Sequence, residues 1–322
     1  NTTINRFIVF GNNQNLKTIR MGTFLGHFVP GLSLALLGLW HLFNTIRSYC
    51  LKGPEAFSAK FWFPFPKLKH LELILILFFS FLSITLLTLD FPNFNFSSLK
   101  PDNLEHASMF LHLIIFACFA LFCELTLCSD LFSGLIGVLS ASVFAQELFL
   151  LHFHSTDHSG LEGHYHFLLQ LIAFVSFSSA LASASFPKSF SAALFLPISV
   201  MFQGCWFLNM GFMLWVPEYV PRGCVSNMST STDNNRRSVY HSGAVACESP
   251  GAEIRAKALA NLQFSWMLSA ILIITCALCH KYSGKVVLPK IRSSLEYERL
   301  CRQGSDRSAT VTVEAPASSD QQ

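Results

Sequence analysis

The sequence predicts an all-α membrane protein with seven transmembrane helices, and three observations support this class. Of the 322 residues, 52% are hydrophobic and only 13% are charged, and the mean hydropathy is +0.45. A soluble domain carries about 25% charged residues, so this chain has too few charges to coat a soluble surface. The chain also contains apolar stretches of about 20 residues, the length that crosses a hydrocarbon core of about 30 Å.

Seven apolar stretches have this length. They cover residues 22–46, 68–90, 104–128, 131–152, 164–186, 190–216 and 258–280. Residues 21–282 therefore form the membrane domain. The polar residues 1–20 carry Arg6, Lys17 and Arg20 and lack the apolar core of a signal peptide, so we expect an unstructured leader or an upstream extension.

Two segments outside the apolar stretches are long. Residues 217–257 are predicted to form a long outer loop between the sixth and seventh spans. Residues 283–322 run from a basic stretch into an end rich in Ser, Asp and Gln, with almost nothing to bury. We therefore expect a disordered cytosolic tail.

Basic residues predict the orientation. The loop after the first span contains five of them: Arg47, Lys52, Lys60, Lys67 and Lys69. The segment after the seventh span is also basic, so the positive-inside rule places both in the cytosol and the N-terminus outside. The glycosylation motifs that begin at Asn95 and Asn227 fall on the predicted outer side and agree with this orientation.

The net charge and the cysteine spacing argue against a nucleic-acid-binding protein and against a zinc-finger protein. A formal net charge of +3, spread between apolar segments, gives no reason to expect a nucleic-acid partner. The ten cysteines show no zinc-finger spacing. Cysteines in apolar stretches are typical small buried hydrophobes, whereas Cys224 and Cys247 of the outer loop either form a disulfide or are incidental.

Histidines are concentrated where the fourth span turns into the fifth. Five lie between His152 and His166, together with Asp157 and Glu162. Glu147 lies within the fourth span, where an unpaired charge costs about 2.5–3.5 kcal/mol or more, so it must be protonated, paired or bound to a metal. If the helix continues beyond residue 152, Glu147, His154 and His158 share one face.

Because neighbouring spans are antiparallel, we expect further polar groups to lie at the same membrane depth as this histidine-rich turn. The predicted metal ligands are His27, His106, Glu147, His154, His158 and His166. Supporting polar residues are Asp157, Glu162, His164, Gln203 and Asn209. Imidazole and carboxylate ligands suit a divalent metal, with zinc favoured. Two other interpretations remain open: a solvated histidine-rich loop, and a buried hydrogen-bond network that only fixes helix packing.

The half of the membrane domain that is predicted to face the cytosol contains fewer polar residues. They are His41, His70, Glu72 and Glu124. Because they lie near helix ends and next to Lys67 and Lys69, we expect interfacial ion pairing rather than a second site. The chain also contains no HExxH helix and no paired CxxC motif, so no standard zinc geometry is present.

Several motifs resemble those of the transmembrane protein 45 family, in its plant-type form. They are Met-Gly at 21–22, His27-Phe-Val-Pro-Gly, Gly38-Leu-Trp, His106, Glu124, Glu147 with the following histidine-rich turn, and Gln203-Gly-Cys-Trp. The resemblance covers residues 21 to about 285 and makes Met21 the expected natural start. It implies seven spans, an outer N-terminus and a shared interior site, and it implies no established activity.

Three functions fit these observations besides simple metal binding. An open metal position would make the protein an intramembrane lipid hydrolase, with Asp157 or Glu162 as the base. A relay through Glu147 and the histidines would make it a proton or metal transporter, although acids are absent along much of that path. A receptor or scaffold without chemistry needs only the seven spans. The bilayer is the expected partner, homodimerisation is compatible with the small-residue faces, and the organelle is not predicted.

Overall fold

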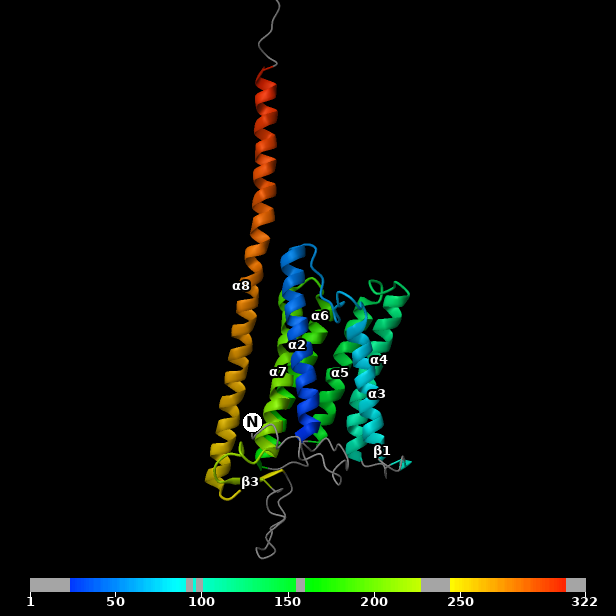
Figure 1. Ribbon diagram of the computed structural model, residues 1–322, viewed down its shortest axis with the longest axis vertical. Helices are drawn as coiled ribbons and strands as arrows, with labels where there is room; N and C mark the ends of the chain where they lie inside the picture. The colour runs from blue at the N-terminus through cyan, green and yellow to red at the C-terminus, as the bar shows by residue number, and fades with distance from the viewer. Residues whose placement is uncertain (1–23, 91–94, 97–100, 155–159, 227–243, 311–322) are drawn as a thin grey trace, which may run out of the picture.

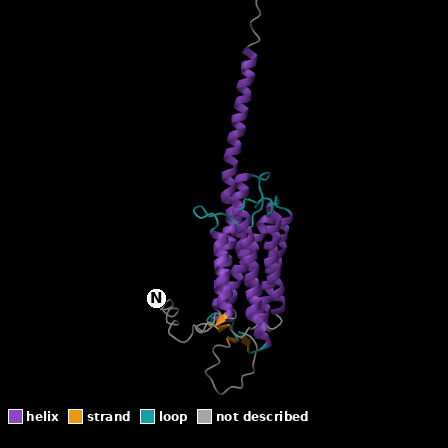
Figure 2. Ribbon diagram, turned by 90° about the vertical axis from the view of Figure 1, so that its right-hand side faces the viewer, coloured by secondary structure: helices purple, strands orange, loops and turns teal. Residues whose placement is uncertain are grey.

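The computed structural model describes residues 24–90, 95–96, 101–154, 160–226 and 244–310. Seven long helices pack side by side with their axes roughly parallel (Figures 1 and 2). All seven are long and apolar enough to cross a membrane. The protein is therefore an integral, multi-pass membrane protein, as the sequence predicts.

The helices follow the predicted order of spans. They are α2 (Phe24–Lys52), α3 (Leu71–Thr88), α4 (Pro101–Leu125), α5 (Ser133–His154), α6 (Gly160–Ser185), α7 (Phe190–Trp215) and α8 (Pro250–Thr310). Two short antiparallel ladders join β1 (Leu89–Asp90) to β2 (Asn95–Phe96) and β3 (Cys224–Ser226) to β4 (Val245–Cys247). Both ladders lie at one end of the bundle, which we call the strand end (Figure 1). The C-terminal part of α8 projects from the opposite end, which we call the tail end.

Small residues allow α2 and α7 to pack backbone against backbone. A Cβ atom added to Gly204 would lie 2.1 Å from the backbone nitrogen of Ala35, and one added to Gly38 would lie 2.3 Å from that of Met201. Gly31 faces α7 in the same way. Glycine is therefore required for this approach, because any side chain would collide with backbone atoms of the partner helix.

The helices form two packed groups that meet at α5 and α6. Trp206, Tyr165 and Leu214 lie at the centre of the larger core, to which α2, α6, α7 and α8 contribute. Leu73 and Ala117 lie in a second core, which α3, α4 and α5 form with Trp62. In Figure 1, α8 lies at one edge of the bundle and the α3–α4 pair at the other.

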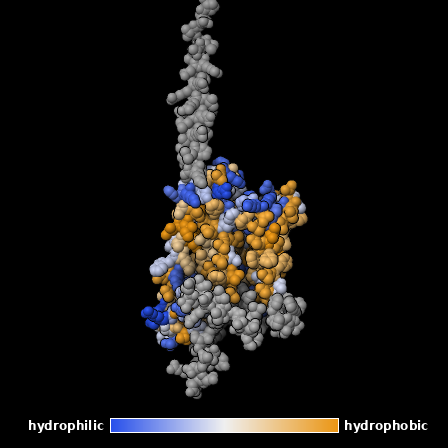
Figure 3. Space-filling model, in the orientation of Figure 1, coloured by the Kyte–Doolittle hydropathy of each residue, from blue (hydrophilic) through white to orange (hydrophobic). Residues whose placement is uncertain are grey.

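The bundle surface is apolar over most of its height. Phe122, Ile273 and Trp266 are 57%, 69% and 66% exposed. Figure 3 shows a largely apolar surface over the visible face of the bundle, with hydrophilic residues at the tail end and near the start of α8. Such exposure is unfavourable in water and is expected where lipid tails cover the helices. The described face thus matches a bilayer environment.

The last helix departs from the prediction at both ends. It begins at Pro250, eight residues before the predicted span, because the Ser249 hydroxyl accepts a hydrogen bond from the backbone of Ala252 and proline suits the first helical position. It continues to Thr310, so the expectation of a disordered tail from residue 283 is wrong over 283–310. Leu, Glu, Arg and Lys are common there and favour helix.

Candidate functional site

Two histidines from different helices lie next to each other near the strand end. His27 of α2 and His166 of α6 have ring centroids 6.3 Å apart, in an edge-to-face arrangement. Each residue is only 6% exposed. The His27 ring also lies 4.3 Å from the ring of Trp215 on α7. The pair therefore forms a buried imidazole cluster with an aromatic wall.

The main chain sets the protonation pattern of His166. Its Nδ1 lies 2.9 Å from the backbone carbonyl oxygen of Glu162, one helical turn earlier. A carbonyl only accepts hydrogen bonds, so Nδ1 must carry the proton. In the neutral imidazole, Nε2 is then the atom with the lone pair, which is the tautomer that a metal-binding histidine uses.

The carboxylate of Glu162 anchors the outer loop over this pair. Glu162 is 4% exposed, and its Oε2 accepts a 2.6 Å hydrogen bond from the backbone nitrogen of Ala244, just before β4. Cys224 and Cys247 are joined by a disulfide across the β3–β4 ladder. The long loop predicted from the sequence therefore contains an ordered, cross-linked hairpin that packs on the strand end of α6.

Glu147 has a different partner. Its carboxylate accepts a hydrogen bond from the side-chain amide of Gln203 on α7. The amide oxygen of Gln203 in turn accepts a 3.3 Å hydrogen bond from the hydroxyl of Ser176 on α6. Glu147 thus belongs to a polar contact among α5, α6 and α7.

The structure separates Glu147 from the histidine pair along the bundle axis. On α7, Gly211 packs against His27, whereas Gln203 contacts Glu147. Eight residues of helix correspond to about 12 Å. The expectation that Glu147 and His27 share one membrane depth is therefore wrong, because the spans are long enough to hold two polar layers.

Of the other predicted ligands, the structure describes the side chain of His106 but not those of His154 and His158. His106 lies half-buried on α4, which packs against α3 and α5 rather than against α2. Helix α5 ends at His154. The side chain of His154 and residues Asp157 and His158 lie outside the described part of the chain. Among the side chains that the structure describes, no group of three His, Cys, Asp or Glu residues is arranged to hold a metal ion.

Two of the predicted supporting residues, Asn209 and His164, contact α8. Asn209 Nδ2 and the hydroxyl of Tyr165 both donate to Oε1 of Gln263, over 3.1 and 2.9 Å. His164 Nε2 lies 2.8 Å from Oδ1 of Asn261. Asn261 and Gln263 were not predicted from the sequence, although two amides within an otherwise apolar span were a visible signal. These hydrogen bonds attach α8 to α6 and α7.

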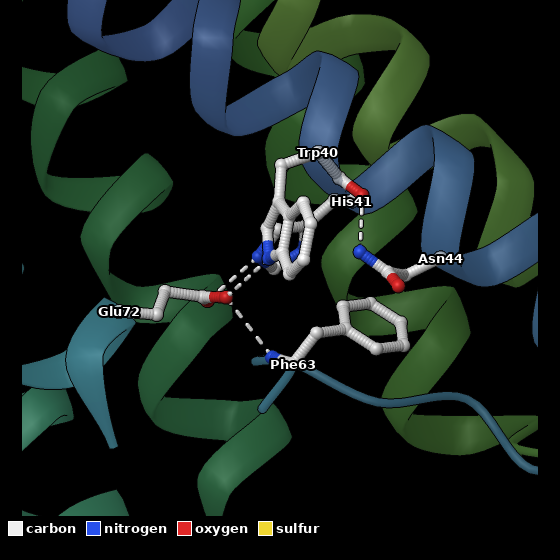
Figure 4. A network of polar contacts seen from close by, with 5 residues as sticks. All are labelled: Trp40, His41, Asn44, Phe63 and Glu72. Atoms are coloured by element: carbon white, nitrogen blue, oxygen red, sulfur yellow. Dashed lines mark hydrogen bonds and ion pairs between the residues drawn. The ribbon is translucent and has the colours of Figure 1, made fainter. Parts of the chain in front are cut away.

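A second polar centre lies toward the tail end, around Glu72 of α3 (Figure 4). Its carboxylate accepts hydrogen bonds from Nε2 of His41 at 2.7 Å, Nε1 of Trp40 at 3.1 Å and the backbone nitrogen of Phe63 at 3.0 Å. Glu72 is 3% exposed. The predicted ion pairing at this level is present between Lys69 and Glu124 at 2.9 Å. The Glu72 centre ties α2, α3 and their connecting loop together.

Comparison with known families matches part of the chain. Residues 133–280 are similar to DUF716, a family of unknown function. The matched region begins with α5 and ends within α8, so it includes Glu147, His166, Gln203 and the disulfide hairpin. Helices α2–α4, with His27 and Glu72, precede it. The description of the family names no activity, so the match carries none to this chain.

Proposed function

We propose that this multi-pass membrane protein binds one divalent metal ion, with zinc favoured, at the buried pair His27 and His166. The observation that supports this proposal is the meeting of two imidazoles from helices 139 positions apart in the sequence, in a site that is almost closed to the surface. Neutral imidazole is a preferred ligand of borderline metals such as zinc.

The distance between the two rings is compatible with shared coordination. With Zn–N bonds of about 2.0–2.1 Å and tetrahedral angles, two imidazoles on one ion have ring centres about 5 Å apart. The ring centroids of His27 and His166 are 6.3 Å apart. The two separations differ by about 1 Å, which is within the range of side-chain rotation.

A hydrogen bond to His166 favours the same role. The carbonyl of Glu162 holds Nδ1 of His166, and metal-binding histidines commonly have such a partner because it fixes the ring orientation. Of the predicted ligands, His154 is the last residue of α5 and His158 follows it in the sequence before α6, the helix that carries His166. They are the proposed source of the remaining ligands. Glu147 is left out because Gln203 is its partner.

We also infer that the chain is a plant-type member of the transmembrane protein 45 family. The motifs around His27, Gly38 and Gln203 support this assignment, and the match to a family of unknown function over residues 133–280 is compatible with it. Membership would imply an interior site shared with the rest of the family. It would not imply any reaction.

Zinc titration of chelator-treated protein in detergent tests the metal proposal. Isothermal calorimetry on the unsubstituted chain is expected to show one site, and His27→Ala and His166→Ala are each expected to weaken it by about tenfold or more. The matched control is His112→Ala, because Nδ1 of His112 contacts only its own helix at Ser108 and the substitution is expected to leave zinc affinity unchanged. Unchanged affinity in both pair variants, or no binding at all, would overturn the proposal.

A readout that needs no substitution covers the case in which a variant fails to fold. Cobalt(II) added to the unsubstituted protein is expected to give visible d–d absorption bands of a tetrahedral site with nitrogen ligands, and zinc is expected to abolish them. A spectrum identical to that of hydrated cobalt would contradict the proposed site.

A further inference from the structure

Two cysteines lie together on α8 near the tail end of the bundle. Cys276 is exposed and Cys279 is half-buried. Residues three apart on a helix lie on the same face, so the two thiols are neighbours. A third thiol, Cys50 of α2, and Cys276 are both close enough to Cys279 to interact with it electrostatically. The tail end therefore holds a cluster of thiols rather than a single cysteine.

The surface around the α8 pair faces the lipid. Ile273 and Leu272 are 69% and 45% exposed, in the turn before Cys276. Because exposed apolar residues on a membrane helix contact acyl chains, Cys276 opens onto the hydrocarbon layer. An acyl chain attached there would extend into lipid without displacing packed side chains.

Charged and aromatic groups place Cys279 at the edge of that layer. Lys281, two residues later, is exposed and is the first permanently charged residue after the span. Two residues of helix correspond to about 3 Å. The next residue, Tyr282, has its ring 5.5 Å from that of Phe43 on α2, so α8 is still packed on the bundle here. The thiol pair therefore lies where the headgroups meet the acyl chains.

We propose that Cys276 and Cys279 form an S-acylation site whose donor is a long-chain acyl thioester. The cysteine thiol gives up its proton and its sulfur attacks the carbonyl carbon of the donor thioester. A new C–S bond forms, the C–S bond of the donor breaks, and the departing thiolate takes up the proton. The exchange needs no oxidant or reductant. Juxtamembrane cysteines are the usual acceptors of this modification.

Four cysteines elsewhere in the described structure lack this combination of features: Cys118, Cys123, Cys224 and Cys247. Cys118 on α4 is also exposed, but it lies six residues, or about 9 Å along the helix, from the nearest charged residue, Glu124. Cys123 is buried, and Cys224 and Cys247 are in the disulfide. Cys118 is therefore a matched control: a lipid-exposed thiol without a neighbouring thiol or cation.

An acyl-exchange assay on the full chain expressed in a eukaryotic host tests the proposal. Hydroxylamine followed by a mass tag is expected to shift the band of the unsubstituted protein, and Cys276→Ser/Cys279→Ser is expected to lose the tag. Cys118→Ser is expected to keep it. Peptide mass spectrometry of the unsubstituted protein, which does not depend on variant folding, is expected to find the acyl group on the Cys276–Cys279 peptide. An untagged unsubstituted protein, or a double variant that is tagged as before, would overturn the assignment.

Discussion

The side-chain amide of Gln203 on α7 donates a hydrogen bond to the carboxylate of Glu147 on α5. Because the hydroxyl of Ser176 donates to the other end of the same amide, the two residues connect three helices inside the membrane domain. Within the described part of the chain, the partner of Glu147 is thus a neutral amide and not a cation. A carboxylate in hydrocarbon is costly unless its charge is neutralised, so this contact suits a protonated Glu147.

The first prediction concerns the charge of Glu147. Glutamine at this position still offers an acceptor to Gln203, so Glu147→Gln is expected to unfold within a few degrees of the unsubstituted protein in a thermal scan in detergent. Glu147→Leu leaves the amide of Gln203, which is 1% exposed, without this partner, at a cost of about 1–3 kcal/mol. Equal destabilisation by both substitutions would show that the fold needs the negative charge and hence a bound cation.

The second prediction concerns the Glu72 centre. Glu72→Ala removes the acceptor of three donors, two of them side chains of α2 and one the backbone of Phe63. Loss of one member of a buried charged network costs about 3–5 kcal/mol, and the loop around Phe63 is expected to become sensitive to protease at the same time. Glu55→Ala is the control, because Glu55 is exposed in the same loop. Protease resistance equal to that of the control would contradict the assigned role.

The third prediction concerns the contact between α2 and α7. Gly204→Ala puts a methyl group 2.1 Å from the backbone nitrogen of Ala35, which has no flexible end that can move away. Overpacking of this kind costs about 1–3 kcal/mol or more, and we expect a lower unfolding temperature and loss of the monodisperse peak in size-exclusion chromatography. Gly134→Ala is the control, since nothing lies within 4 Å of a Cβ atom there. If Gly204→Ala behaves like Gly134→Ala, α2 and α7 must lie farther apart than in this structure.

The fourth prediction concerns sidedness. The two termini of the bundle lie at opposite ends (Figure 1), and the basic loop after α2 predicts that the strand end is outside. Asn95 in β2 lies at the strand end and begins a glycosylation motif. Expression in eukaryotic cells is expected to give a band that glycosidase shifts, and Asn95→Gln is expected to reduce that shift. Glycosylation confined to a motif engineered into the loop at residues 53–56 would reverse the orientation.

Much of the fold could be predicted because the bilayer imposes it. A span must be apolar over about 20 residues and must satisfy its own backbone as a helix, so hydropathy alone gave the number and order of the helices. The start of α8 depends instead on the cap at Ser249, and its continuation to Thr310 depends on helix propensity. Neither appears in a hydropathy profile.

The polar partners could be predicted only in part. The sequence shows that Glu147 and Gln203 need partners, but their contact joins residues 56 apart and depends on which faces of α5 and α7 meet. The same holds for Glu72, whose donors Trp40 and His41 lie more than 30 positions earlier. The depth of Glu147 was predicted wrongly because residue counts give a level along one helix and not its register against the neighbouring helices.

Metal content of the detergent-purified protein, prepared without chelator and determined by plasma mass spectrometry, tests the proposed site most directly. The account predicts close to one zinc per chain in the unsubstituted protein and in Glu147→Gln, and a strongly reduced content in His27→Ala/His166→Ala. Zinc that is absent from the unsubstituted protein, or equally present in the double histidine variant, would contradict the claim that this pair holds a metal.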